Sequence, residues 1–153
     1  MDIVDIVDKF RADMGAKTGV RTELEPAAAV SGDPAIIIRH NPPALRVSRV
    51  SDDGSGLIWF REISLTLYLV ATGSGDKKFR KAMAKLSQPL AALFDNDDGG
   101  GDIPLDDTGT WYAAYMGTVR PGDRLLRNEE LEGSFDWNEA WDVRLYVPEN
   151  AFA

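Results

Sequence analysis

The alternation of hydrophobic and polar positions is clearest in residues 57–70, where every second residue from position 63 is apolar. The apolar set is Ile63, Leu65, Leu67 and Leu69, and the intervening set is Glu62, Ser64, Thr66 and Tyr68. A period of two places the two sets on opposite faces of an extended chain. The pattern therefore predicts a β-strand with one buried face.

After a break at residues 71–75 the period becomes helical, because apolar residues recur at steps of three or four. These residues are Phe79, Met83, Leu86, Leu90 and Phe94. The predicted helix can fold back over the apolar face of the preceding strand. Pro89 lies inside it, and we expect a kink or a restart near Ser87, since an interior proline costs about 3 kcal/mol.

Residues 2–14 also follow a helical period, with Asp2 as the predicted N-cap and Gly15 as the predicted end. The apolar stripe is Ile3, Ile6, Val7, Phe10 and Met14. Two interpretations are open for this helix: it covers a sheet, which we favour, or it is an arm that binds a partner subunit.

Residues 35–70 predict an antiparallel hairpin. Its first arm begins with the β-branched run 35–39, is interrupted by His40-Asn-Pro-Pro43 and resumes at 45–50. Two consecutive prolines imply a bulge, an edge or a turn, because they remove two backbone donors. Residues 51–56 have the composition of a turn. A further short strand is predicted at 20–25.

The rest of the chain adds two strands and one loop. Residues 95–109 are rich in Asp and Gly, have no period and predict a mobile loop. Strands are predicted at 110–119 and 137–147, whereas 125–135 is ambiguous. Without βαβ alternation, these elements indicate an α+β fold. We expect one domain over residues 1–153, with a mostly antiparallel or mixed sheet and two main helices packed on one face.

The amino-acid composition argues against several classes of protein. The chain has 17 Lys and Arg against 25 Asp and Glu, a net charge of -8, which argues against general binding of nucleic acid or of an anionic membrane. It has no cysteine, so neither a disulfide framework nor a thiolate metal site can form. No run approaches the roughly 18 apolar residues of a membrane span, and the acidic start is not a signal peptide.

The sequence offers no catalytic, cofactor or metal signature. The single histidine, His40, cannot form a catalytic triad with a cysteine or a metal site with other histidines, and we interpret it as a satisfied turn residue. A pair of catalytic carboxylates is not excluded by residue count, but nothing singles out two acids. Residues from Asp95 onward do not match the calcium-binding loop of an EF-hand, because Gly99 occupies the fifth position, where that loop has a ligand.

Charge is segregated between two neighbouring segments. Residues 76–85 carry five cations and one acid, and the basic face that we select is Lys77, Arg80, Lys81 and Lys85. Residues 95–107 carry six acids and no cation, and those we select are Asp95, Asp97, Asp98 and Asp102. One interpretation is a solvated helix face. The other is a head-to-tail interface between copies, in which opposite charges set the orientation.

The order of elements, together with Pro34-Ala35, Pro89, Trp137 and the closing run Trp141–Val147, resembles the tail terminator, or tail completion, proteins of long-tailed phages. The resemblance extends over nearly the whole chain and is one of pattern. The Asp/Gly segment 95–109 and the turn at 120–123 depart from the smallest relatives.

The resemblance implies a non-enzymatic virion protein, assembled in the host cytoplasm without a cofactor, that forms a ring, typically hexameric. Such a ring caps the head-proximal end of the tail tube, stops its polymerisation and docks the head connector. The implied partners are other copies, the tube protein, the connector or neck protein and, in a contractile tail, the sheath terminator. DNA would pass through the channel without specific binding. The alternatives are another head-tail joining, neck or minor tail protein and, from a different class, a small α+β domain that binds a ligand or calcium.

Overall fold

The computed structural model describes residues 2–25, 35–50, 53–71, 76–94, 100–104, 112–119, 126–127 and 137–152. The helices are α1 (Ile3–Thr18), α2 (Asp76–Phe94) and the 3-10 helix η1 (Glu149–Phe152). The strands are β1 (Thr22–Leu24), β2 (Ala35–Val50), β3 (Leu57–Ala71), β4 (Gly100–Pro104), β5 (Tyr112–Val119), β6 (Leu126–Arg127) and β7 (Trp137–Pro148). Together they confirm the predicted α+β class.

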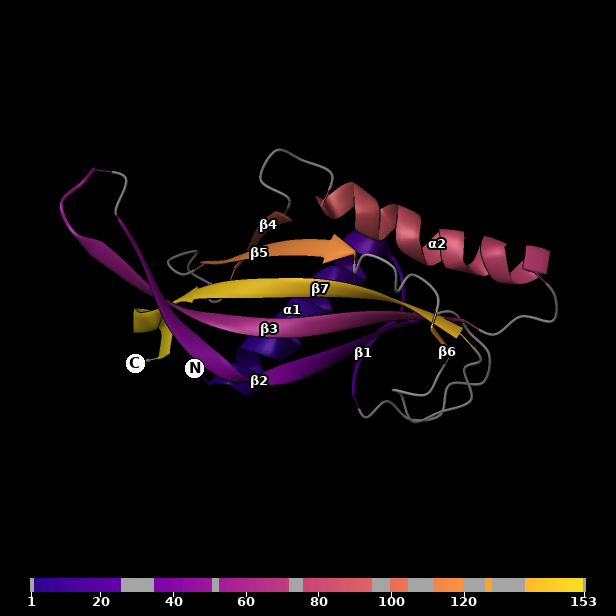
Figure 1. The fold of residues 1–153 in the computed structure, drawn as a ribbon, viewed down its shortest axis with the longest axis horizontal. Coiled ribbons are helices and arrows are strands. Elements are labelled where there is room, and N and C mark those ends of the chain that lie inside the picture. The colour runs from indigo at the N-terminus through magenta and orange to yellow at the C-terminus, as the bar shows by residue number, and fades with distance from the viewer. Residues whose placement is uncertain are drawn as a thin grey trace.

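These described strands form one seven-stranded sheet in the order β1-β2-β3-β7-β5-β4, with β6 paired to β7 beside this path (Figure 1). Only the pairing of β1 with β2 is parallel, so the sheet is mixed but mostly antiparallel. The predicted hairpin is confirmed, because β2 pairs with β3 from Ala35↔Val70 to Val50↔Leu57. The expected irregularity at the prolines is a bulge between Asn41 and Leu45, and the Pro42–Pro43 peptide is cis.

The hydrophobic core lies between one face of this sheet and the two long helices. One cluster of buried side chains joins Phe10 of α1 and Leu86 of α2 with Ile38 of β2, Leu67 of β3 and Val143 of β7. The alternating apolar set of β3 is fully buried in it, as predicted. Both main helices therefore cover the same face of the sheet, and α1 lies behind the strands in Figure 1. Covering the sheet is the role that we favoured for α1.

A capping box begins helix α1. The Asp2 carboxylate accepts a hydrogen bond from the Asp5 backbone N–H at 2.9 Å, and the Asp5 carboxylate accepts one from the Asp2 N–H at 3.3 Å. The predicted N-cap is confirmed. The predicted end is wrong, because the helix continues through Gly15 to Thr18 and is capped by Gly19, whose φ of 67° suits glycine.

Replacing Asp2 by alanine should lower the free energy of unfolding by about 1 kcal/mol, because the N–H of Asp5 loses its acceptor. Urea denaturation measures the change. Asp2→Asn is the matched control, since an amide oxygen can still accept this bond, and it should retain most of the stability. Equal losses in both variants would assign the effect to charge rather than to capping.

The second face of β3 differs from the prediction. Thr66 and Tyr68, expected on an exposed polar face, are each only 1% exposed. Their neighbours Ile37 on β2 and Ala140 on β7 are buried as well. The central strand is therefore buried on both faces over this half of its length, and the simple alternation concealed this because Tyr and Thr count as polar.

Three further expectations change. Helix α2 is continuous from Asp76 to Phe94 through Pro89, so the restart expected near Ser87 does not occur, and a kink there stays a prediction. Residues 100–104, inside the segment predicted to be a loop, form strand β4, because β5 supplies an antiparallel partner that offsets the low strand preference of two glycines. The remainder of the 95–109 segment lies outside the described residues. Within the ambiguous 125–135 segment, Leu126–Arg127 is a short strand.

Candidate interaction surface

The β2–β3 hairpin extends beyond the rest of the sheet. Strand β1 pairs with β2 only as far as Ile38, and β7 pairs with β3 only from Phe60 onward. Within the described residues, 48–50 and 57–59 thus pair only with each other, whereas 45–47 pair with 60–62, which also pair with β7. We call residues 45–50 and 57–60 the hairpin arm. In Figure 1 this arm projects from the sheet at the left of the view. A two-stranded ribbon is only marginally stable by itself. Contacts between its own side chains, or contacts with another molecule, must therefore stabilise it.

Large apolar side chains are exposed on the hairpin arm. They are Leu45 (54% exposed), Val50 (64%), Leu57 (59%), Ile58 (39%) and Trp59 (38%). The register places Val50, Leu57 and Trp59 on the face that continues the core side of the sheet, and Leu45 and Ile58 on the other face. Apolar groups exposed on both faces of one projecting ribbon are typical of a surface that binds another protein.

Arginine side chains of the same arm contact its aromatic rings and helix η1. The Arg46 guanidinium lies 4.0 Å from the centroid of the Trp59 ring, and that of Arg49 lies 5.5 Å from the Phe60 ring. The Glu149 carboxylate accepts hydrogen bonds from Arg46 Nε at 2.9 Å and from Arg61 Nη2 at 3.2 Å. Helix η1 thereby anchors the base of the arm. Arg46 and Arg49 are exposed and give the arm positive charge in a chain of net -8.

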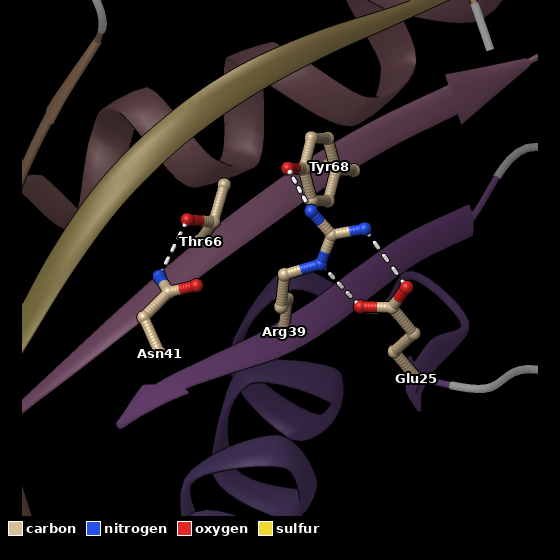
Figure 2. A network of polar contacts seen from close by, with 5 residues as sticks. All are labelled: Glu25, Arg39, Asn41, Thr66 and Tyr68. Carbon is tan, nitrogen blue, oxygen red and sulfur yellow. Dashed lines mark hydrogen bonds and ion pairs between the residues drawn. The ribbon is translucent and has the colours of Figure 1, made fainter. Parts of the chain in front are cut away.

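A polar network lies on the face of the sheet that is turned away from α1 and α2 (Figure 2). Arg39 donates from Nε and Nη2 to the two carboxylate oxygens of Glu25, the second bond measuring 2.9 Å, and from Nη1 to the Tyr68 hydroxyl at 3.0 Å. The Asn41 amide donates to the Thr66 hydroxyl at 2.8 Å. These bonds satisfy buried polar groups and tie the residue after β1 to β2 and β3. We therefore assign the network a structural role.

An open hollow of about 150 Å³ lies where the start of α1 meets the β1–β2 edge of the sheet. Its lining residues are Val4, Val7, Leu24, Glu25, Ile38 and His40. His40 corrects the prediction of a satisfied turn residue, because it lies within β2 and its buried Nε2 has no hydrogen-bond partner. The sequence signal for an irregular position nearby is the pair Pro42 and Pro43, which forms the bulge after His40.

The structure separates the predicted charged residues. Lys77, Arg80, Lys81 and Lys85 all lie on α2, and the last two are exposed; the side chains of the first two fall outside the described part. Asp102 occupies a position in β4, whereas Asp95, Asp97 and Asp98 lie outside the described residues. No contact between the two sets is described, so their pairing stays a prediction.

The sequence analysis missed the hairpin arm as a surface. A signal was present, since Leu57-Ile-Trp-Phe60 is four consecutive apolar residues in a strand that alternates only further on. Such a run predicts a strand with both faces covered. In this protein the two faces of the arm are left exposed, which a sequence cannot show.

No group of three or more acidic or histidine side chains that could hold a metal ion occurs within the described residues. No helix in the described part of the chain has the length and apolar character needed to cross a membrane.

Comparison with known proteins finds similarity of structure but none of sequence. No family model matches the chain, and no curated relative matches its sequence. Among solved structures, the chain is similar to a chain from the virion of a native gene transfer agent particle, with 15% identity and a TM-score of 0.43. The alignment covers 94% of this chain and 91% of that chain. At this identity and TM-score the similarity carries no argument about function.

Proposed function

We propose that this protein is a non-enzymatic virion structural protein that forms a homo-oligomeric ring, a hexamer, at the head-proximal end of a phage tail tube. The observation that carries the proposal is the hairpin arm, which exposes large apolar side chains beside arginines on a projecting ribbon. The order of elements in the sequence supports the phage tail terminator class. In this role the ring stops polymerisation of the tube and docks the head connector.

The charged segments have separate roles in this proposal. We assign the basic face of α2 (Lys77, Arg80, Lys81 and Lys85) to contact with a neighbouring subunit or the tube, because it lies on a rigid element. Asp95, Asp97, Asp98 and Asp102 belong to the interface with that face or to the lining of the DNA channel. A negatively charged channel would let DNA slide without adhering.

The deciding experiment adds purified protein to polymerising tail tubes and follows tube length by electron microscopy. A terminator should halt elongation at one end and give tubes of limited length, with a ring visible at that end. Native mass spectrometry of the protein alone should show a discrete oligomer. Tubes that elongate at the same rate with and without the protein would exclude the terminator function, and a head-joining or neck role would then be tested with purified connectors.

A further inference from the structure

Two arginines stand directly opposite each other at the base of the hairpin arm. Arg46 of β2 and Arg61 of β3 are cross-strand partners, and the register places them on the core-side face of the ribbon together with Trp59. Like charges in directly opposite positions destabilise an antiparallel pair of strands. An anion that contacts both guanidinium groups would therefore stabilise the base of the arm.

Glu149 supplies this anion. One oxygen of its carboxylate accepts a hydrogen bond from Arg46 Nε at 2.9 Å, and the other accepts one from Arg61 Nη2 at 3.2 Å. Glu149 directly follows Pro148, the last residue of β7 that pairs with β3, so it stands where the arm leaves the sheet (Figure 1). Ala151 is buried in the core cluster and fixes η1 in place. The carboxylate is thus held by the core of the protein.

The contacts continue from Glu149 through Arg46 to Trp59. The Arg46 guanidinium lies 4.0 Å from the centroid of the Trp59 ring, on the same face of the ribbon. A guanidinium over an aromatic ring is attracted by the π electrons and covers one side of the ring. Because Glu149 holds Arg46, the exposed Trp59 ring is oriented by a chain of contacts that begins in helix η1.

These ion pairs matter more for the arm than for the whole fold. The side chains of Arg46, Arg61 and Glu149 are 53%, 39% and 30% exposed, and exposed ion pairs change an equilibrium by only about two- to fivefold. Residues 48–50 and 57–59 pair only with each other among the described residues, which gives a ribbon of marginal stability. A factor of this size can decide how well ordered the arm is, although it contributes little to the stability of the core.

We propose that Glu149 is a positioning residue for the assembly surface. It holds Arg46, and through Arg46 the Trp59 ring, in the orientation in which the hairpin arm meets its partner. The inference deepens the proposed function, on which the link to assembly rests. It gives helix η1 a role beyond ending the sheet, because this helix connects the core to the arm.

Hydrogen exchange tests the positioning of the arm in the protein itself. Glu149→Ala should raise the exchange rate of the amides in 45–50 and 57–60 about two- to fivefold, since opening of the arm no longer breaks the two ion pairs. Glu23→Ala is the matched control, because it removes an exposed ion pair with Arg21 at 3.4 Å. Opening of the arm leaves that pair intact, so the arm should exchange at the parent rate in this control. All proteins are compared at a dilution at which sedimentation shows monomers.

The fluorescence of Trp59 gives a second readout. Its signal is the difference between each protein and the same protein carrying Trp59→Phe. Acrylamide should quench this signal more strongly in Glu149→Ala than in the parent, because Arg46 is no longer held over the ring. Quenching in Glu23→Ala should equal that of the parent. An ion pair with a merely structural role would leave the Trp59 signal unchanged.

Self-association tests the link from positioning to assembly. Glu149→Ala should weaken it about three- to tenfold, because binding must then also order the ring and the guanidinium. Arg46→Ala should weaken it at least as much. The double variant should associate no more weakly than Arg46→Ala alone, since Glu149 acts through Arg46. Losses that multiply in the double variant would contradict this chain of contacts.

The positioning role and the terminator function fail in distinguishable ways. Arm amides that exchange at the parent rate in Glu149→Ala protein would overturn the positioning role, whatever the tube assay gives. Faster exchange with unchanged self-association would overturn the link to assembly. Tubes that elongate equally with and without the parent protein would remove the terminator function and leave the exchange results unaffected.

Discussion

The free energy of unfolding of a Phe10→Ala variant is expected to be about 3–5 kcal/mol lower than that of the parent chain. Phe10 is 0% exposed and lies where α1 packs on the sheet, within the cluster that also contains residues of α2, β2, β3 and β7. Truncation removes the apolar contacts of the ring and leaves a cavity that the surrounding strands can only partly fill. Since domains are typically stable by only about 5–15 kcal/mol, this single change removes a large part of the total.

Urea denaturation followed by tryptophan fluorescence measures this loss. Val4→Ala is the matched control, because Val4 lies on the same helix but is 72% exposed, and its substitution should change stability by less than about 0.5 kcal/mol. A Phe10→Ala variant as stable as the control would contradict the packing of α1 against the sheet.

The second large effect is expected on assembly rather than on folding. Trp59→Ala should weaken self-association at least about tenfold, because large aromatic side chains dominate the binding free energy of protein interfaces. The folded monomer should lose less than about 1 kcal/mol, since Trp59 is 38% exposed and its ring contacts the exposed Arg46 on the arm.

Sedimentation equilibrium measures the association, and urea denaturation of dilute protein measures the stability. Trp59→Phe is the control, because it keeps an apolar ring at this position and should associate within about threefold of the parent. Association of Trp59→Ala at the parent's affinity would show that the arm is not part of the subunit interface.

Periodicity predicted most of the fold. The alternating run in β3 and the helical stripes in α1 and α2 are long, so each identified both the element and its buried face. The hairpin followed from the turn composition at 51–56. The parallel pairing of β1 with β2 did not follow, because it depends on contacts between segments rather than on the pattern within either one.

The surfaces were less predictable than the core. Tyr68 and Thr66 were assigned to an exposed face, yet both are buried. The Tyr68 hydroxyl accepts a hydrogen bond from Arg39, which lies on the neighbouring strand β2. The apolar run 57–60 is typical of a strand covered on both faces, whereas the ribbon extends past its neighbours and exposes Leu57, Ile58 and Trp59. Exposure is a property of the whole assembly of strands, so local sequence patterns cannot determine it.

The two prolines in the bulge interrupt the row of backbone donors along the outer edge of β2. Among the described strands, β1 covers the outer edge of β2 only as far as Ile38, which would otherwise leave a long row of backbone donors facing solvent. Pro42 and Pro43 have no N–H to offer, so a foreign strand cannot add continuously along this border. Edge-to-edge addition of strands along the whole of β2 should therefore be disfavoured, which leaves side chains rather than backbone groups to make contacts between chains.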